Sequence, residues 1–436
     1  MKDKHSYGII GGGMLGLTLA LRLAQHGHKV SIFEANNDVG GLAATWEIGD
    51  ITWDKYYHVI LMSDFYLRNL LKDIGIENKL VWNETKTGFY TDGKLYSMSN
   101  TLEFLKFPPL NIIDKLRLGA TIFYASKVKN WQRLEKIGVE KWLIRLSGKR
   151  TFNKIWLPLL KAKLGASYKD ASASFIWATI QRMYAARKSG LKKEMFGYVD
   201  AGYASIFAPL IEKLNQLAVE IHTGFAVQNI KSVQSQGIEI YGNENKKFYF
   251  DKCIVTLTSN SITRLLPDIS AEQKMKHENL TYLGVICVSL ILKNSISPYY
   301  VTNITDDWVP FTGVIEMSAL VDKKQFNGNS FIYLPKYVLS NSELFQKSDN
   351  EISEDFINAL IRMYPSIKKD EILFTGVARA RNVFALATHN YSSNLPNVET
   401  NIPGLYILNS AQITNGTLNV NETVQLAEKF IKQYCY

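Results

Sequence analysis

The sequence predicts an α/β fold in which a Rossmann-like nucleotide-binding domain carries an inserted second domain. At the start of the chain an apolar run, a glycine turn, an apolar helical pattern and a second apolar run follow one another within residues 7–33. Strand and helix patterns alternate again at residues 196–230 and 404–431. Between the first two segments lies a long stretch of helical and basic character, beginning near residue 101. A chain of 436 residues, 46% of them hydrophobic, is large enough for two or three domains.

The first glycine turn has the spacing G-x-G-x-x-G, supplied by Gly11, Gly13 and Gly16. In this position one glycine makes the tight turn, one lets the backbone approach a pyrophosphate, and one lets the helix pack on the strand. Gly27 is expected to end the helix as its C-terminal cap, because glycine adopts the left-handed conformation needed there. The order of turn, helix, cap and strand predicts a dinucleotide site.

The ligand is expected to contact the start of this helix and the end of the second strand. Met14 and Leu15 begin the helix, where unpaired N–H groups and the helix dipole favour phosphates. Glu34, followed by Ala35, ends the second strand and is placed to accept hydrogen bonds from an adenosine ribose. These residues complete the predicted nucleotide-binding unit.

A second glycine pair, Gly40 and Gly41, follows within the segment DVGGLAATW at residues 38–46. This segment resembles the extended fingerprint of two-domain flavoproteins, in which Gly40, Gly41 and Leu42 would pass close to the phosphates of the flavin. Rossmann domains that bind only NAD do not carry it. The predicted cofactor is therefore FAD, and we expect it to be non-covalent because no cysteine or histidine stands at a family attachment position.

Composition bounds the class of protein further. No run of 18 or more apolar residues is present, and residues 283–292 are predicted to form a buried strand rather than a membrane span. The first strand begins so soon after Met1 that no signal peptide is expected. Cys253, Cys287 and Cys435 are isolated, which favours a reducing cytoplasm over a disulfide framework. No spacing of potential ligands indicates a metal site.

The net charge of +10 is concentrated in one part of the chain. Residues 101–200 contain 20 Lys and Arg against 7 Asp and Glu. This asymmetry indicates an anionic partner, either a lipid headgroup surface or a phosphorylated substrate, although a solvated helical face would look the same. Nucleic acid is not expected, because the basic residues come with helical periodicity rather than a nucleic-acid module.

Within this basic region, residues 112–138 place apolar residues near helical spacing among lysines and arginines. The stripe includes Ile113, Leu116, Ala120 and Phe123. Two interpretations are open: a basic amphipathic helix in a membrane interface, or the buried face of a helical cap domain, which is the preferred one. Farther along, the crowded basic residues from Arg182 to Lys193, with Tyr184, are a candidate phosphate site.

Residues 51–60 are predicted to be one strand. Its alternation would place Asp54 and His58 on one face and Tyr57 on the other. A helix is expected at residues 64–74, and a hairpin with an Asp-Gly turn at 88–98.

Taken together, the motifs resemble the superfamily of FAD-containing enzymes that includes protoporphyrinogen oxidase, phytoene desaturase, monoamine oxidase and UDP-galactopyranose mutase. The resemblance rests on GIIGGGMLG with Glu34, DVGGLAATW, YVDAGYASIFAPLIEKL, HTGFAVQNI and PGLYILNSAQITNGTLNVNETVQLA. It implies a discontinuous FAD-binding domain and an inserted α+β substrate domain with a helical cap. The FAD-binding domain would comprise residues 1–85, 196–265 and 376–436, and the substrate domain residues 86–195 and 266–375.

The resemblance also implies the remaining cofactor contacts. Val227 would meet the adenine through its backbone. Asn409 and Ser410 stand where family members commonly have Gly-Asp, so hydrogen bonding would be retained without the charge. The N-terminus of the last helix, which begins near Asn419, would point at the flavin ring. The contacts there are assigned to Leu418, Asn419 and Val420.

The first functional hypothesis is an FAD-dependent oxidoreductase of the oxidase, desaturase or dehydrogenase type. Its substrate would be bulky and lipophilic, lipid-linked or phosphate-bearing, and the enzyme would be cytoplasmic or peripheral to the inner face of the membrane. A histidine could shuttle protons near neutral pH, or serve only as a hydrogen-bonded structural residue. The catalytic candidates are Tyr57, His58, Arg381 and His389. The candidate substrate contacts are Arg182, Tyr184, Arg379 and Tyr391.

The second hypothesis is a non-redox flavoenzyme acting on a nucleotide sugar in polysaccharide biosynthesis. The segment NITDDWVPFTGVIEMSAL at residues 303–320 resembles a segment of UDP-galactopyranose mutases. However, Gly313 stands where that family has an arginine for the substrate diphosphate, and DKYYHVI replaces the family's GAHIFHT. A third hypothesis is a non-catalytic scaffold that keeps FAD for stability. The oligomeric state does not follow from the sequence.

Overall fold

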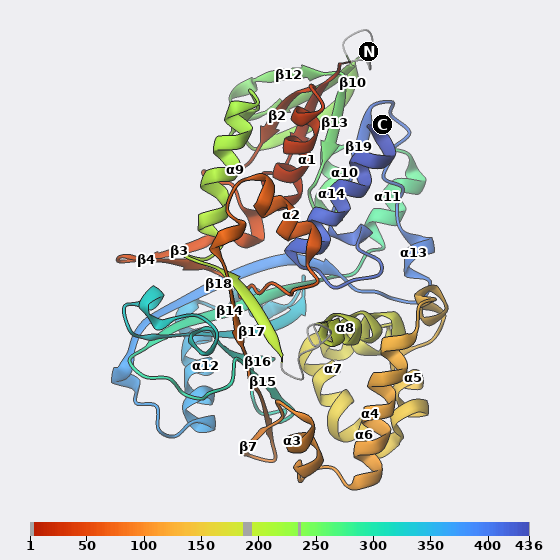
Figure 1. Cartoon of the computed structure of the whole chain (residues 1–436). Helices are drawn as coiled ribbons and strands as arrows, with labels where there is room; N and C mark the ends of the chain where they lie inside the picture. The colour runs from red at the N-terminus through yellow and green to blue at the C-terminus, as the bar shows by residue number, and fades with distance from the viewer. Residues whose placement is uncertain (1–3, 186–193, 234–236, 436) are drawn as a thin grey trace.

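The computed structural model describes residues 4–185, 194–233 and 237–435, and two sheets organise them (Figure 1). The first is a five-stranded parallel sheet of order β19-β13-β1-β2-β9. Its strands are β1 (Ser6–Ile10), β2 (Lys29–Phe33), β9 (Glu220–His222), β13 (Lys252–Val255) and β19 (Leu405–Ile407). Segments from the beginning, middle and end of the chain therefore share one sheet.

Both faces of the parallel sheet are covered. On one face, apolar side chains of four helices meet in a single core: α1 (Met14–Gln25), α2 (Phe65–Asp73), α9 (Ala204–Gln216) and α14 (Val420–Tyr434). On the other lies an antiparallel sheet with α10 (Ser259–Leu265); its strands are β10 (Val227–Val233), β11 (Gly237–Gly242) and β12 (Lys247–Phe250). This arrangement matches the Rossmann-like domain that the sequence predicts.

The second large sheet has seven strands in the order β18-β14-β17-β16-β15-β6-β7, antiparallel except between β15 and β6. Its strands are β6 (Thr87–Thr91), β7 (Lys94–Ser97), β14 (Tyr282–Leu292), β15 (Val301–Ile304), β16 (Gly313–Glu316), β17 (Ser330–Leu339) and β18 (Ile372–Ala385). β14 is buried along its whole length, as expected, and α12 (Asp349–Met363) packs against the sheet. The predicted domain boundary between residues 375 and 376 falls inside β18, so that boundary is too early.

The predicted hairpin is present between β6 and β7. Asp92 and Gly93 both have positive φ angles, 54° and 69°, as a two-residue hairpin turn requires. The predicted strand at residues 51–60 is shorter than expected. β4 (Ile51–Asp54) pairs with β3 (Thr45–Ile48) and ends at Asp54, because β3 offers no partner beyond that point. Residues 55–59 are therefore not in a strand.

A group of helices with its own core lies beside the seven-stranded sheet (Figure 1). Leu118, Trp142 and Leu143 are among its buried residues. The elements are α3 (Thr101–Lys106), α4 (Ile112–Lys127), η3 (Trp131–Lys136), α5 (Val139–Ser147), α6 (Lys149–Thr151), η4 (Phe152–Trp156), α7 (Leu157–Leu164), η5 (Gly165–Lys169) and α8 (Ala173–Ala185).

The preferred interpretation of the apolar stripe in this region is wrong for α4. Ile113, Leu116 and Phe123 are 59%, 64% and 59% exposed, so they do not form a buried face. Leu118 and Ala125, on the opposite side of the helix, face the core instead. Among the described residues, no helix is both long and apolar enough to cross a bilayer.

Further short elements link these parts. β5 (Leu80–Glu84) pairs with β8 (Met195–Val199) between the two large sheets. The remaining elements are η1 (Gly41–Ala43), η2 (Glu77–Lys79), η6 (Asn243–Asn245), α11 (Ala271–Glu278), η7 (Met317–Ala319), η8 (Lys323–Phe326), η9 (Glu343–Gln346), η10 (Lys369–Glu371), α13 (Tyr391–Asn394) and η11 (Ser410–Gln412).

Candidate functional site

The first glycine motif forms a tight cradle at the start of α1. Gly11 has a φ angle of +112°, and its N–H donates to the Phe33 carbonyl at 2.8 Å. A Cβ atom at Gly16 would lie 2.0 Å from the Gly11 carbonyl oxygen, whereas a Cβ at Gly13 would meet nothing within 4 Å. The chain is therefore closely packed behind the turn and open in front of Gly13. The first turn of α1 has no side-chain cap and no acidic residue, as an anion site requires.

The second glycine pair packs against the first. The Gly40 N–H donates to the Gly12 carbonyl at 2.9 Å, and a Cβ at Gly41 would lie 3.4 Å from the Gly13 Cα. The φ angles of Gly40 and Gly41 are +127° and +57°, which glycine adopts without strain. Leu42 follows, half-buried, in η1. The structure thus brings together the two motifs that the sequence separates by more than 20 residues.

Glu34 lies buried at the end of β2, beside the cradle. Its Oε2 accepts the Gly12 N–H at 2.7 Å, and its Oε1 accepts the backbone and side-chain N–H groups of Asn36 at 2.9 and 2.7 Å. A carboxylate can accept about four hydrogen bonds, so Glu34 keeps capacity for a ribose hydroxyl. The Glu34 carbonyl accepts the Phe225 N–H at 2.9 Å, which places Val227 close to this acid. Ala35 is exposed beside it.

The C-terminal motif closes the same region. Asn409 is buried, and its Oδ1 accepts the Ala411 N–H while its Nδ2 donates to the Leu257 carbonyl, both at 2.9 Å. Its side chain therefore orders the loop, and its contact with the cofactor stays a prediction. The Ser410 Oγ donates to the Val383 carbonyl at 3.3 Å.

The last helix begins where the resemblance places it. Asn419 caps α14, since its Oδ1 accepts the Glu422 N–H at 3.1 Å. Leu418 precedes this cap and is half-buried, and Val420 begins the helix and is buried. The glycine cradle, the acid, the neighbouring strand β10 and this helix form a site that fits a dinucleotide.

A cluster of aromatic residues and one lysine adjoins this site. The Tyr57 and Tyr337 hydroxyls are 2.7 Å apart, and the Lys163 Nζ lies 4.0 Å from the Tyr337 ring centroid and 5.9 Å from that of Phe384. We call Tyr57, Lys163, Tyr337 and Phe384 the tyrosine–lysine cluster. Burial raises the pKa of both tyrosines, so their hydroxyls stay protonated. Burial lowers the pKa of Lys163 to about 8.

Two hydrogen bonds of neighbouring residues connect the tyrosine–lysine cluster to the predicted nucleotide site. The Lys55 N–H, two residues before Tyr57, donates to the Ala44 carbonyl just after the second glycine pair. Phe384 follows Val383, whose carbonyl accepts the Ser410 hydroxyl. The tyrosine–lysine cluster is therefore linked through neighbouring residues to both the fingerprint loop and the C-terminal motif.

His58 lies next to the cluster and is held by an acid. Its Nδ1 is 3.3 Å from the Asp54 Oδ2, and its ring packs against Tyr203 with centroids 4.6 Å apart. Asp54 is buried, and its Oδ1 accepts the Tyr203 N–H at 2.9 Å. This contact favours a proton on Nδ1 and leaves Nε2 as the nitrogen that can exchange one.

The catalytic candidates Arg381 and His389 and the candidate substrate contact Arg379 lie outside the tyrosine–lysine cluster. The Arg379 guanidinium pairs with Asp349 and donates to the Lys347 carbonyl, and Arg381 packs on Phe345 at 4.7 Å. Both arginines project from β18 toward the start of α12 and the loop before it, where they contact residues of this chain. His389 is exposed beside the start of α5, where a Cβ at Gly138 would lie 3.6 Å from its Nε2.

The predicted substrate contacts are mostly engaged inside the protein. Arg182 makes a bidentate ion pair with the buried Asp64 at 2.9 and 3.1 Å, so it joins α8 to the start of α2 instead of offering a phosphate site. Tyr184 is half-buried near the end of α8, and the rest of the predicted basic cluster, residues 187–193, lies outside the described residues. The buried Tyr391 donates to the Ala411 carbonyl at 2.8 Å and so supports the C-terminal motif.

Sequence reasoning missed Lys163 and Tyr337. The only signal for Lys163 is a lysine within the apolar helix sequence LPLLKAKL, which equally describes a solvated side chain. Tyr337 lies in β17, and its partner Tyr57 is 280 positions away in the sequence. No group of residues in the described part of the chain could hold a metal ion.

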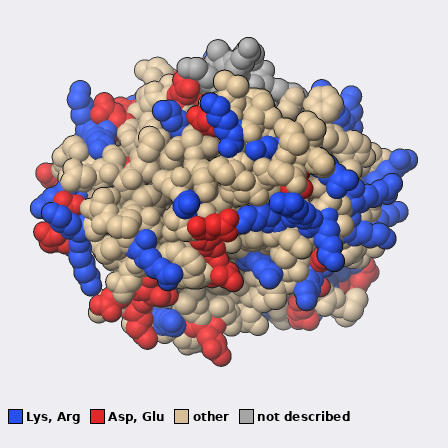
Figure 2. Space-filling model, turned by 90° about the horizontal axis from the view of Figure 1, so that it is seen from below, with Lys and Arg blue, Asp and Glu red and all other residues tan. Residues whose placement is uncertain are grey.

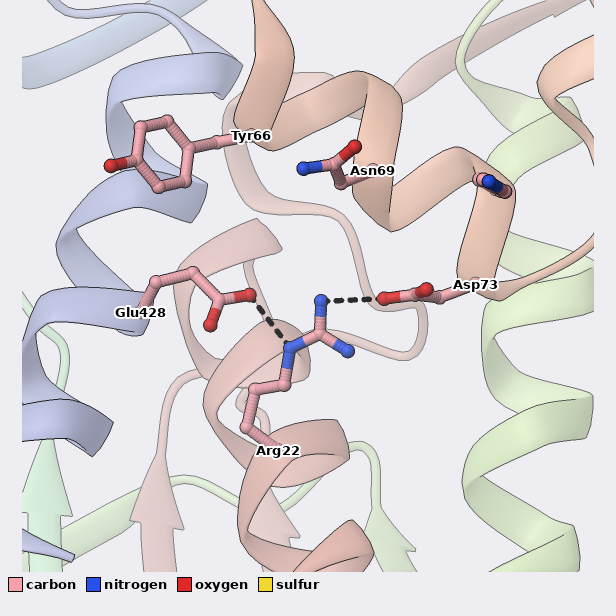
Figure 3. Close-up of a pocket in the computed structure, with 6 residues that line it drawn as sticks. Arg22, Tyr66, Asn69, Asp73 and Glu428 are labelled. Carbon is pink, nitrogen blue, oxygen red and sulfur yellow. Dashed lines mark hydrogen bonds and ion pairs between the residues drawn. The ribbon is translucent and has the colours of Figure 1, made fainter. Parts of the chain in front are cut away.

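A separate surface hollow of about 450 Å³ lies among helices α1, α2 and α14 (Figure 3). Arg22 points between Glu428 and Asp73, with ion pairs of 2.7 and 2.8 Å. Although burial lowers the pKa of Arg22, its bonds to Glu428 and Asp73 outweigh burial and raise it. No predicted site residue lines this hollow. Through its two ion pairs, Arg22 connects α1 to α2 and α14.

Comparison with known proteins adds independent evidence. The family described as flavin containing amine oxidoreductase matches residues 15–394. A 15-cis-phytoene desaturase of Glycine max is 22% identical over 381 residues, which cover 82% of this chain and 65% of that protein. This chain therefore spans about two thirds of the length of that relative.

Two solved structures illustrate the shared fold. An oxidoreductase from Methanosarcina mazei has a TM-score of 0.75 at 17% identity and covers 98% of this chain and 100% of its own. A reduced UDP-galactopyranose mutase has a TM-score of 0.75 at 15% identity, covering 99% and 97%. Nearly the whole chain thus adopts the fold of these proteins.

Proposed function

The chain belongs to the flavin containing amine oxidoreductase family and is an FAD-dependent oxidoreductase, and on this premise we propose that it oxidises a bulky lipophilic substrate carrying an anionic or polar group. The observation that carries the proposal is the tyrosine–lysine cluster. Its rings offer an apolar wall, and Lys163 supplies one cation on which no carboxylate acts among the described residues. The desaturase relative acts, by its name, on phytoene, a substrate class that matches such a wall.

Each part of the nucleotide site has a task toward the cofactor. Gly11, Gly13 and Gly16 let the backbone of α1 approach the pyrophosphate, and Glu34 would bond the ribose. The N-terminus of α14 would place its positive dipole end toward the flavin ring. Bound FAD supplies a ring system that accepts a hydride from a C–H bond of the substrate.

On the substrate side, the protein orients and exchanges protons. One of the neutral Tyr57 and Tyr337 hydroxyls donates to the other, so the second keeps its proton to donate a hydrogen bond to a substrate oxygen. Lys163, with a pKa of about 8, stays mostly charged at neutral pH and would hold an anionic group. His58, fixed by Asp54, would take up or release a proton at Nε2.

The test begins with the absorbance spectrum of the purified protein and anaerobic reduction of its flavin by lipid fractions. We expect Lys163→Met to weaken reduction by an anionic lipophilic substrate about tenfold, because one charge-assisted contact is lost. Lys161→Met is the matched control, since Lys161 is exposed on the same helix. Equal rates in both variants would contradict the role of Lys163, and a protein that takes up no FAD would contradict the whole proposal.

A second candidate, a nucleotide-sugar mutase, is supported by the similarity of residues 303–320 and by the shared fold. Gly313 lies buried in β16, opposite Asn303 of β15, so no side-chain cation stands at that position. Tight binding of a UDP-sugar only after dithionite reduction would support this candidate over the oxidoreductase. If the protein turned over neither a lipophilic substrate nor a nucleotide sugar, the remaining hypothesis would be a non-catalytic scaffold that keeps FAD for stability.

A further inference from the structure

Helix α4 buries several polar side chains and exposes several large apolar ones. Its inward side carries polar groups: Asp114 accepts the Thr151 hydroxyl at 3.1 Å, and the Lys115 ammonium donates to the Leu105 carbonyl at 2.7 Å. Thr121 is also buried, 2.9 Å from the Ser147 hydroxyl. A surface helix in water normally buries its apolar side and exposes its polar one. Leu118 and Ala125 also face inward, so the buried side of α4 is mixed, whereas its outward side is largely apolar. This apolar outward side indicates that it meets something other than water.

The outward side of α4 and the neighbouring α3 carry large apolar residues. We call this the α3–α4 face, defined by residues that are between 44% and 70% exposed. They are Leu102, Leu105, Ile112, Ile113, Leu116, Phe123 and Tyr124. The bond from Lys115 to the Leu105 carbonyl joins the two helices, so the residues belong to one surface. Exposed apolar residues gathered in this way mark an interaction site.

The charges around the α3–α4 face are positive. Its exposed charged residues are Lys106, Arg117, Lys127 and Lys129, and the Lys127 ammonium lies 5.4 Å from the Phe123 ring centroid. The acids of residues 101–129, Glu103 and Asp114, are not exposed. Figure 2 shows Lys and Arg gathered on the side of the molecule where Figure 1 places these helices.

A basic hollow of about 710 Å³ borders the same helices. It is lined by Pro109, which lies between α3 and α4, and by Lys149, Arg150 and Lys154, with Asp92 as its acid. Arg150 reaches the Asp114 carboxylate of α4 at 3.2 Å and is itself 69% exposed. A cationic hollow next to an apolar helix face matches a lipid, whose phosphate and chains meet at such a boundary.

We propose that the α3–α4 face rests on the surface of an anionic phospholipid bilayer. The apolar side chains enter the boundary between headgroups and chains, and the surrounding lysines and arginines attract the lipid phosphates. The helices lie in the plane of the membrane, because α4 has 16 residues and carries polar groups along its inward side. A second copy of this chain is disfavoured as the occupant, because its own positive face would be repelled by this one.

The experiment is flotation of the purified full chain with lipid vesicles. We expect binding to vesicles of phosphatidylcholine mixed with phosphatidylglycerol, and binding at least about fivefold weaker to phosphatidylcholine alone. Added salt should weaken binding to the vesicles that contain phosphatidylglycerol, because ions screen exposed charges. The double variant Leu116→Gln and Phe123→Gln should reduce binding about tenfold or more, since both side chains lose apolar contact.

Met275→Gln and Leu373→Gln form the matched control. These residues are 55% and 51% exposed and lie on α11 and β18, away from the α3–α4 face. Retained binding in this control supports the proposal. Equal loss in both double variants, or no binding of the parent to either vesicle, would overturn it. A parent chain that is a dimer in solution, dissociates in the Leu116→Gln and Phe123→Gln variant and ignores vesicles would show that a second copy covers the face.

Discussion

Helices α1 and α4 are both rich in apolar residues, but they expose them differently. Leu17, Leu19 and Leu21 of α1 are fully buried in the core beside the parallel sheet. Leu116 and Phe123 of α4 are more than half exposed. The comparison teaches that apolar spacing indicates a helix, while the neighbouring elements decide which of its sides meets water. The nucleotide-binding region surrounds its helix completely, and the helical region leaves one side of α4 without a protein neighbour among the described residues.

The largest expected effect on stability comes from adding a side chain at Gly16, where the glycine cradle has no space for one. In Gly16→Ala the new methyl group would lie 2.0 Å from the Gly11 carbonyl oxygen, which belongs to the backbone and cannot move aside cheaply. We expect a loss of about 3 kcal/mol or more in the free energy of unfolding, together with loss of bound FAD. Urea unfolding and the ratio of flavin to protein absorbance measure both.

Two other glycines serve as controls for this prediction. Gly13→Ala should fold normally but bind FAD more weakly, because its methyl group enters the open space in front of α1. Gly119→Ala in α4 meets nothing within 4 Å and should raise stability by about 0.5–1 kcal/mol. If Gly16→Ala behaved like Gly119→Ala, the tight packing of the cradle would be disproved.

The second prediction tests the two sides of α4 directly. Leu118→Ala should lower the free energy of unfolding by about 2–4 kcal/mol, because Leu118 is 2% exposed and its removal leaves a cavity. Leu116→Ala should change it by less than about 0.5 kcal/mol, because Leu116 is 64% exposed. Chemical denaturation of both variants without lipid measures the difference, and equal losses would mean that the helix is rotated from the orientation described here.

The third and smallest effect is a pH dependence confined to the nucleotide-binding region. Burial lowers the pKa of His277 to about 4, and its Nδ1 lies 2.9 Å from the Ser259 hydroxyl. Its ordinary pKa is about 6.5, so the unfolded chain binds a proton first as the pH falls. The stabilisation is complete above about pH 6.5 and is lost as the pH falls toward 4. Between pH 7 and pH 5.5 the loss is about 1 kcal/mol.

Hydrogen exchange at these two pH values locates the effect. Residues 101–185 contain no histidine, so α4 and α5 should not lose protection through this route, whereas α10 and α11 should. His277→Asn should flatten the dependence. An unchanged slope in that variant would assign the acid sensitivity to another group.

Most of the nucleotide site could be predicted from the sequence because its geometry is local. The turn, helix and acid lie within residues 11–34, and Gly40 and Gly41 follow a few residues later. Their roles depend on backbone angles that glycine alone adopts without strain. The same local logic predicted the hairpin at Asp92.

The substrate side was less predictable because its partners are distant in the sequence. Arg379 pairs with Asp349, 30 positions away, and Arg182 pairs with Asp64, 118 positions away. The strand predicted over residues 51–60 ends at Asp54 because pairing with β3 ends there, which alternation alone does not reveal. Lys163 and Tyr337 meet only because α7 packs on β17.

The order of strands in the parallel sheet also bears on how the protein is made. β13 lies between β1 and β19, so strands from residues 6–10 and 405–407 flank the same neighbour. During synthesis on the ribosome, the outer edge of β13 stays unpaired until residue 407 has emerged. An unpaired edge is a template for association with other chains, so the nascent protein needs shielding of this edge while residues 256–407 are translated. If FAD binds at the start of α14, as we propose, its capture marks a chain that has been translated and folded at least as far as that helix.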